Sequence, residues 1–385
     1  MKRIGIRDED KYAMERRSAL TPKHAQALIE KHGIQIDVLS SKKRAFTDKE
    51  FLEKGCNIVD NLDDNRIIFG IKEIPIDKIA SDKTYIIFSH VIKGQAHNMP
   101  MLKKFMKKKC NLIDYECIVD DNNKRLIFFG HYAGLAGTIN TLWAFGLRTA
   151  HLGITTPFKK LRQTHTYFSL DEALETIKEI GKDITTNGLP KELLPLTIGI
   201  TGYGNVSKGA QEILKHLPVI EITPEELLEL KQKATYSDKH IYKIVFYEKH
   251  IAKHKKGAAF DLNEFFTQPA NFISNFNQYT PHLSILLNCM YWDDRYDRLI
   301  TKDYLADLYS NKNLRLHVIG DITCDPNGSI EFTHMGTEIN DPIFVYHPIT
   351  RQPTFGHKGE GVVVMAVDIL PSELPRDSSN AFFFF

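Results

Sequence analysis

The sequence predicts an α/β protein made of two doubly wound, Rossmann-like domains separated by a cleft. Its 385 residues exceed the usual size of a single compact core. Short apolar runs alternate with helical stretches in both halves, a pattern typical of parallel sheets. A glycine-rich turn at 202–204 lies between an apolar run and a helical stretch, as in phosphate-binding βα units.

The first domain is expected over residues 1–135, where it would form the substrate (catalytic) domain. Between its first two expected strands, TPKHAQALIEKHG predicts a helix with Thr21 as N-cap, Pro22 at the first helical position and Gly33 as its stop. Apolar runs predict strands at 4–6, 36–40, 66–71, 85–90, 110–116 and 125–130.

A second, dinucleotide-binding domain is expected over 136–355. The small-residue stretch HYAGLAGTINTLWAFGLRTAHLG predicts a long, closely packed helix that connects the domains. Strands are expected within 194–205, 283–292 and 315–323, whereas the charged stretch near 221–280 looks too polar for a core layer and predicts a surface insertion. Residues 356–385 are expected to complete the first domain.

Composition excludes several classes of partner. The net charge of +2 and the 25% charged content favour neither nucleic acid nor a membrane surface. The acidic start, MKRIGIRDED, does not resemble a signal peptide, and no run is long enough for a membrane span. Five scattered cysteines without a CxxC pair indicate free thiols, no metal site and a reducing, cytoplasmic location.

The glycine turn is the strongest motif on physical grounds. In LTIGITGYGNVSKGAQEIL, Gly202 would allow the tight turn, and Gly204 would let a pyrophosphate approach Asn205 and Val206 at the helix start. Ser207 replaces the usual third glycine, although Gly209 remains available for helix packing. A dinucleotide site is the favoured interpretation, and an ordinary βα turn is the alternative.

The choice between NAD and NADP depends on the next expected strand, in PVIEITPEE. An acid at its tip would bind the ribose diol, but Glu221 could point away and Thr223 occupies the tip. This arrangement leaves the cofactor as NADP or NAD, with a slight preference for NADP.

Polar residues follow the expected strands of the first domain. Lys72, Glu73, His90, Lys93 and Glu116 all lie at or just beyond carboxyl ends, where open parallel sheets form their ligand crevice. A lysine beside other cations and a histidine can both carry protons near neutral pH. The alternative is that these residues only begin solvated loops.

Cations near this edge predict an anionic substrate. Arg17, before the helix at 22, suits bidentate capture of a carboxylate, and Lys93 and Arg125 could add contacts. Several cations imply a substrate with more than one carboxylate. The alternative for Arg17 is a salt bridge to the acidic stretch at 8–10.

Taken together, several blocks resemble the lysine-ketoglutarate reductase / saccharopine dehydrogenase (L-lysine-forming) family. These blocks are IRDEDKYAMERRSALTPKH, FGIKEIP, FSHVIKGQ, LIDYE, FGHYAGLAGTIN, TGYGNVSKGAQ, CMYW and DITCDPNGSIEF. The similarity runs over nearly the whole chain and is strongest to the reductase half of aminoadipic semialdehyde synthase. The wider group includes alanine dehydrogenase and the N-terminal part of transhydrogenase.

The resemblance implies condensation of L-lysine with 2-oxoglutarate and reduction of the imine to saccharopine by NAD(P)H, or the reverse. It implies Lys72 and His90 as proton carriers, Arg17 as a substrate-carboxylate ligand, and Glu73 and Glu116 as acids that tune them. It further places Asp321 and Tyr291 near the cofactor.

Two other functions stay open at this point. One is an alanine-dehydrogenase-like enzyme acting on a smaller 2-oxo acid, and the other is a non-catalytic dinucleotide-binding protein. The expected partners are small molecules, and the sequence leaves the state of any oligomer open.

Overall fold

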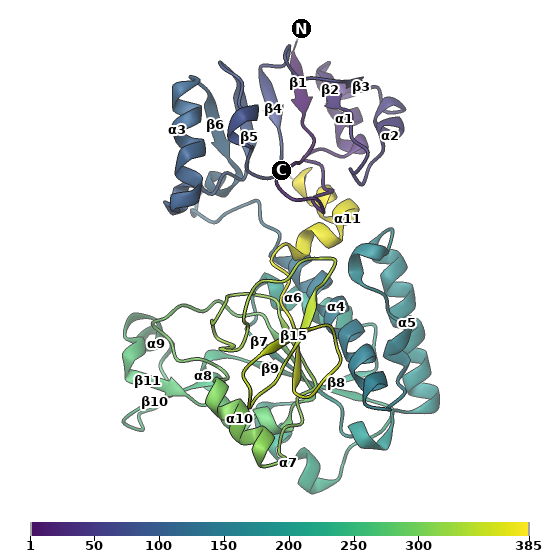
Figure 1. Ribbon diagram of the computed structural model, residues 1–385, viewed down its shortest axis with the longest axis vertical. Helices are drawn as coiled ribbons and strands as arrows, with labels where there is room; N and C mark the ends of the chain where they lie inside the picture. Colours follow the sequence, from purple (N-terminus) through teal and green to yellow (C-terminus); the bar gives the residue numbers. More distant parts are fainter. Residues whose placement is uncertain (1, 384–385) are drawn as a thin grey trace. The chain divides into compact units, whose positions relative to one another are not determined.

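The computed structural model describes residues 2–383 and divides them into two compact units (Figure 1). Unit 1 comprises the chain up to Phe129 together with the segment from Pro371, and unit 2 comprises Gly130–Leu370. The expected boundary at 135 lies inside a helix of unit 2. The expected return at 356 comes earlier than the observed one, because Val362–Met365 forms a buried strand of unit 2.

Unit 1 is a six-stranded parallel sheet in the order β3-β2-β1-β4-β5-β6. This order places the point where the strand order reverses between β1 and β4, as in doubly wound folds. The strands are β1 (Arg3–Ile6), β2 (Gln35–Leu39), β3 (Asn57–Val59), β4 (Ile67–Phe69), β5 (Thr84–Ile87) and β6 (Asn111–Asp114). The helices are α1 (Pro22–His32), α2 (Asp48–Leu52), α3 (Met99–Lys107) and, from the returning segment, α11 (Pro375–Asn380).

Helix α1 follows its sequence signals closely. The Thr21 hydroxyl accepts a hydrogen bond from the His24 backbone N–H at 3.3 Å, Pro22 is the first helical residue, and Gly33 ends the helix with a φ of 60°. The expected strand at 125–130 is wrong: apart from one bridge between Val119 and Arg125, this stretch has no strand pairing in the described chain.

Unit 2 contains an eight-stranded sheet in the order β15-β14-β16-β13-β12-β7-β9-β8, in which β14 runs antiparallel to both of its neighbours and the other pairs are parallel. Its strands are β7 (Thr197–Thr201), β8 (Val219–Glu221), β9 (Ile241–Phe246), β12 (Ile285–Asn288), β13 (Val318–Asp321), β14 (Ile343–Tyr346), β15 (Pro353–Phe355) and β16 (Val362–Met365). A small antiparallel pair is formed by β10 (Ala252–His254) and β11 (Phe272–Ser274).

The helices of unit 2 include the long small-residue helix that the sequence predicts. They are α4 (Gly130–His151), α5 (Leu170–Asn187), α6 (Asn205–Leu214), α7 (Pro224–Lys233), α8 (Glu248–Ile251), α9 (Leu262–Thr267) and α10 (Lys302–Ser310). No described helix is long and apolar enough to cross a membrane.

The stretch 221–280 differs from the expectation of a surface insertion. Its middle part, Ile241–Phe246, is a wholly buried strand that lies between β7 and β8. Lys243 interrupts the apolar run, so the sequence pattern does not indicate a buried strand here. Its amino group lies 2.6 Å from Glu221 Oε2 and 2.9 Å from Gln211 Oε1. The charge of this lysine is therefore paired while its aliphatic stem is buried.

Candidate active site

Lys72 is held at the carboxyl end of β4 by a buried carboxylate that the sequence analysis did not single out. Glu9, which follows β1, accepts hydrogen bonds from the backbone N–H groups of Ile71 at 2.8 Å and Lys72 at 2.9 Å. The Arg7 guanidinium donates to the same carboxylate at 3.1 Å. Burial, which outweighs this cation, raises the pKa of Glu9.

The Lys72 side chain lies among charges of both signs. Burial first, and the neighbouring Arg17 guanidinium second, lower the pKa of Lys72, against the opposing effect of Glu73 and Glu15. Its Nζ atom lies 5.9 Å from the centre of the Tyr12 ring and has no hydrogen-bond acceptor within residues 2–383. An amine in this state is suited to accept a proton.

Glu73 has a half-satisfied carboxylate beside Lys72. Its Oε1 atom pairs with Lys11 Nζ at 2.6 Å, whereas the buried Oε2 atom has no hydrogen-bond partner in the described chain. The free oxygen leaves Glu73 able to accept a hydrogen bond from a bound ligand.

Arg17 is committed to a neighbour rather than left open for a substrate. Its Nε and Nη2 atoms donate to the two oxygens of Glu15 at 2.8 and 2.6 Å, and the guanidinium lies 4.8 Å from the Phe129 ring centre. Ser372 also donates to Glu15, at 2.9 Å. Arg17 is only 4% exposed, so the salt-bridge alternative is realised, although with Glu15 and not with the stretch at 8–10.

His90 forms a second charged cluster at the carboxyl end of β5. Its Nδ1 atom lies 2.8 Å from Glu116 Oε2, and the other oxygen of Glu116 contacts Arg125 at 2.9 Å and Lys93 at 3.5 Å. Burial opposes ionisation of Glu116, but the His90 hydrogen bond and the neighbouring Lys93 and Arg125 hold its pKa below the usual value. Because an ionised carboxylate only accepts, Nδ1 carries the hydrogen and Nε2 is left for proton exchange.

A series of aromatic rings within unit 1 connects His90 to Arg17. His90 stacks on Phe88 with ring centres 6.1 Å apart, and Phe88 contacts Phe129, the ring that Arg17 covers, at 5.7 Å. Phe382 packs against both Phe88 and Phe129. The returning segment therefore supports the side chains between Lys72 and His90.

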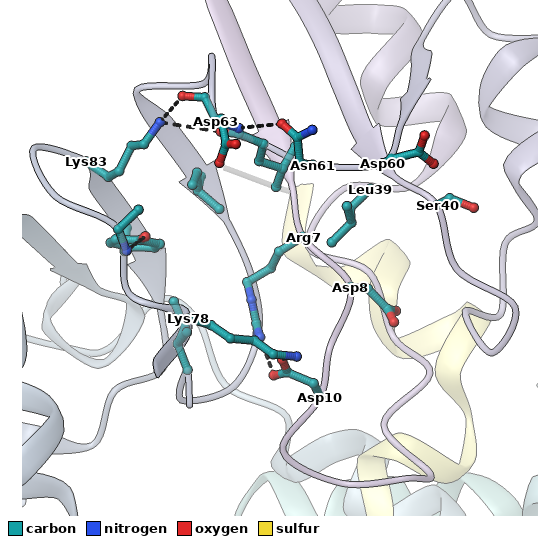
Figure 2. A pocket seen from close by; sticks show the side chains of 15 residues that line it. Arg7, Asp8, Asp10, Leu39, Ser40, Asp60, Asn61, Asp63, Lys78 and Lys83 are labelled. Atoms are coloured by element: carbon teal, nitrogen blue, oxygen red, sulfur yellow. Dashed lines mark hydrogen bonds and ion pairs between the residues drawn. The ribbon is translucent and has the colours of Figure 1, made fainter. Parts of the chain in front are cut away.

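A cavity of about 490 Å³ lies elsewhere in unit 1 (Figure 2). Figure 2 shows Arg7 and Lys78 both directed at Asp10, and the Lys78–Asp10 distance is 2.6 Å. None of the residues expected to carry catalysis lines this cavity.

In unit 2, strand β7 leads through Gly202 and Gly204 into α6. Gly202 has a φ of 82°, and its backbone N–H donates to Phe246 O of β9 at 3.0 Å. A Cβ atom on Gly204 would meet nothing within 4 Å, so protein packing does not require this glycine. The N–H groups of Asn205 and Val206 lack backbone acceptors in the described chain, as expected at a helix start. The arrangement fits a pyrophosphate.

Gly209 takes over the packing role of the missing third glycine. A Cβ atom there would lie 2.1 Å from His131 O of α4, and one on Gly134 of α4 would lie 2.0 Å from Val206 O. Ser207 is fully buried and accepts a hydrogen bond from Gln211 at 3.2 Å. Helices α4 and α6 therefore touch along their backbones.

The other expected cofactor residues of unit 2 differ in their surroundings. Asp321, at the end of β13, is buried, accepts hydrogen bonds from Asn288 at 2.8 Å and Thr323 at 3.0 Å, and has a pKa raised by burial. Tyr291 is 76% exposed. Thr223 is the N-cap of α7, where its hydroxyl accepts from Glu226 N at 3.1 Å.

Both units are Rossmann-like, with a parallel sheet in unit 1 and a mainly parallel sheet with the glycine loop in unit 2. The chain matches the structure of an L-alanine dehydrogenase with a TM-score of 0.61 and 17% identity, covering 99% of this chain and 86% of that one. It matches a transhydrogenase from Sinorhizobium meliloti with a TM-score of 0.56 and 12% identity, covering 99% and 90%. Both likenesses confirm the predicted fold class.

Sequence comparisons identify the relatives within this class. Residues 5–136 match the family described as alanine dehydrogenase/PNT, N-terminal domain. The chain is 38% identical over 98% of its length to the alpha-aminoadipic semialdehyde synthase of Arabidopsis thaliana, of which it spans only 37%. It is 28% identical over 99% of its length to the saccharopine dehydrogenase [NAD(+), L-lysine-forming] of Yarrowia lipolytica, of which it spans 89%. The chain is thus a relative of both groups, which confirms the resemblance seen in the motif blocks.

Proposed function

We propose that this protein is an oxidoreductase of lysine metabolism. It condenses L-lysine with 2-oxoglutarate and reduces the imine to saccharopine with NAD(P)H, or runs the reverse reaction. The observation that carries this proposal is Lys72, a half-buried amine with a lowered pKa and no acceptor in the described chain, at the same sheet edge as the His90–Glu116 pair. The name of the Yarrowia lipolytica relative supplies saccharopine and L-lysine, and the family resemblance of the motif blocks supplies 2-oxoglutarate.

The roles of the side chains follow from their protonation. A neutral Lys72 amine accepts a proton from the ε-ammonium of the substrate, which then attacks the keto carbon. Protonated at Nε2, His90 donates that proton to the hydroxyl leaving the carbinolamine, while Glu116 stabilises the imidazolium. A nicotinamide bound in unit 2 would supply the hydride.

Substrate carboxylates need cations that are still accessible. The side chains of Lys93 and Arg125 are 49% and 38% exposed, so they are better placed for this role than Arg17. The buried Arg17 instead acts on Lys72, whose pKa it lowers. Glu73 offers its free oxygen to an amine.

The remaining assignments also belong to this proposal. Gly202, Gly204, Asn205, Val206 and Asp321 would hold the cofactor. Free thiols at all five cysteines favour a reducing compartment such as the cytoplasm, although the relatives of Rattus norvegicus and Bos taurus are named as mitochondrial.

An initial-rate assay tests the proposal. The purified chain should oxidise a reduced dinucleotide with L-lysine plus 2-oxoglutarate but not with ammonia plus pyruvate. Lys72→Met should lower the rate by about 100-fold or more, without changing dinucleotide affinity. Lys78→Met is the matched control, because Lys78 is an exposed lysine that pairs with Asp10.

Two results would contradict the proposal in different ways. Turnover with ammonia and pyruvate alone would assign the alanine-dehydrogenase-like function. Dinucleotide binding without turnover of either substrate pair would assign a non-catalytic binding protein.

A further inference from the structure

The sheet order of unit 2 changes which residue faces the adenine ribose. In doubly wound nucleotide-binding folds, an acid at the tip of the strand beside the glycine-loop strand binds the ribose hydroxyls. Here β8, the next strand in sequence, is at the sheet edge, and β9 pairs with β7 from Thr197↔Tyr242 to Thr201↔Phe246. The tip beside Gly202 is therefore Phe246–Glu248.

The residues that the sequence offered for this role serve the edge strand instead. Glu221 pairs with Lys243 Nζ at 2.6 Å, and Lys243 also donates to Gln211. Thr223 caps α7 in a reciprocal arrangement with Glu226. Both side chains have structural partners and lie one strand further from the glycine loop.

Glu248 has the surroundings of a ribose ligand. Its Oε1 atom accepts a hydrogen bond at 3.3 Å from the hydroxyl of Tyr203, the residue between the two loop glycines. The Tyr203 ring stacks on Tyr247 with centres 5.0 Å apart, which fixes this tyrosine against the β9 tip. No Lys or Arg pairs with Glu248 anywhere in residues 2–383, so its negative charge is not neutralised by an ion pair.

We infer that Glu248 selects the unphosphorylated ribose, and thus NAD(H) over NADP(H). The carboxylate can accept hydrogen bonds from the 2′- and 3′-hydroxyl groups. A 2′-phosphate would place about two further negative charges beside this carboxylate, which has no Lys or Arg ion-pair partner in the described chain. This inference rests on the proposed function only in requiring a dinucleotide at the glycine loop, and it replaces the sequence-based preference for NADP.

Binding measurements without substrate test the inference. NADH and NADPH are titrated into the purified full chain, and their fluorescence gives the two dissociation constants. NADH should bind at least about tenfold more tightly than NADPH. Glu248→Gln should narrow this ratio about tenfold, Glu248→Arg should invert it, and Tyr203→Phe, which loses only the positioning hydroxyl, should narrow it less.

Glu221→Gln provides the comparison, because it removes the acid that sequence spacing alone would choose. The ratio of its NADPH and NADH dissociation constants should equal that of the unmodified chain. The inference is overturned if NADPH binds as tightly as NADH, or if Glu221→Gln narrows the ratio as much as Glu248→Gln. Failure of both dinucleotides to bind would overturn the proposed function as well, whereas binding without preference would overturn only the role of Glu248.

Discussion

Single residues set the surroundings of Lys72 and His90, the proposed proton carriers of unit 1. The sequence placed Lys72 and His90 at neighbouring strand ends, and β4 and β5 do pair in parallel. The sequence could not show that Arg17 donates two hydrogen bonds to Glu15, because an ion pair between residues two positions apart produces no periodic pattern in the sequence. Glu9 was missed for a similar reason: its partners, Ile71 and Lys72, are backbone groups about 60 residues away.

Variants of Arg17 distinguish two roles for this residue: binding a substrate carboxylate, or lowering the pKa of Lys72. Removing its positive charge in Arg17→Ala should raise the pKa of Lys72, because Arg17 is the largest charge effect that lowers it. A base must be deprotonated to act, so the acidic limb of the pH–rate profile should move upward by about one pH unit. Arg17→Lys, which retains a charge, should move it less.

A different result for Arg17→Ala would contradict this role. A higher KM for 2-oxoglutarate or lysine with an unshifted pH profile would mean that Arg17 binds a substrate carboxylate, as the family resemblance implies.

At the scale of helices and strands, capping signals were more informative than charge. The Thr21, Pro22 and Gly33 signals located α1 to the residue, because each acts on the local backbone. Strand β9 was missed because Lys243 and its charged flanks suggested a solvated loop. Its partners, Glu221 and Gln211, become visible only when the strands are ordered in the sheet.

Two glycines next to the same helix provide a matched pair of variants. Gly209→Ala would place a Cβ atom 2.1 Å from His131 O, so we expect a loss of roughly 1–3 kcal/mol in the free energy of unfolding. Gly204→Ala meets no protein atom within 4 Å and should cost less than about 1 kcal/mol, yet weaken NADH binding about tenfold or more.

Chemical denaturation and NADH titration of both variants check this pair. Equal losses of stability would refute the backbone contact between α4 and α6. Unchanged NADH affinity in Gly204→Ala would refute the phosphate cradle.

For the whole molecule, alternation of strands and helices was sufficient to predict two α/β units, since a helix between two strands allows them to pair in parallel. The point where the chain re-enters unit 1 was not predictable from composition. The run Val362–Met365 could have joined either sheet, and its pairing with β13 and β14 assigns it to unit 2.

Acid should destabilise both units over the same pH range. Burial, with help from nearby cations, lowers the pKa of His24 in unit 1 and of His317 in unit 2 to about 4, from the ordinary 6.5. Between these values the unfolded chain binds more protons than the folded one, so stability falls as the pH falls from 6.5 to 4. Thermal unfolding followed by circular dichroism should show a decreasing midpoint across this window.

The variant His317→Asn isolates one contribution to this effect. Without the half-buried imidazole, the unfolding midpoint should depend less steeply on pH between 6.5 and 4. An identical slope would mean that His317 stays neutral in both states or titrates equally in both.

The return of the chain to unit 1 has a consequence for biosynthesis. The hydroxyl that Ser372 donates to Glu15 comes from a residue 357 positions later, and the side chain of Ser379 receives the backbone N–H of Ser18 across 361 positions. When the first 129 residues leave the ribosome, they still lack these partners and the Phe382 ring. Within this chain, unit 1 is therefore translated before unit 2 but completed after it, so a nascent chain arrested within unit 2 would carry unit 1 without these contacts.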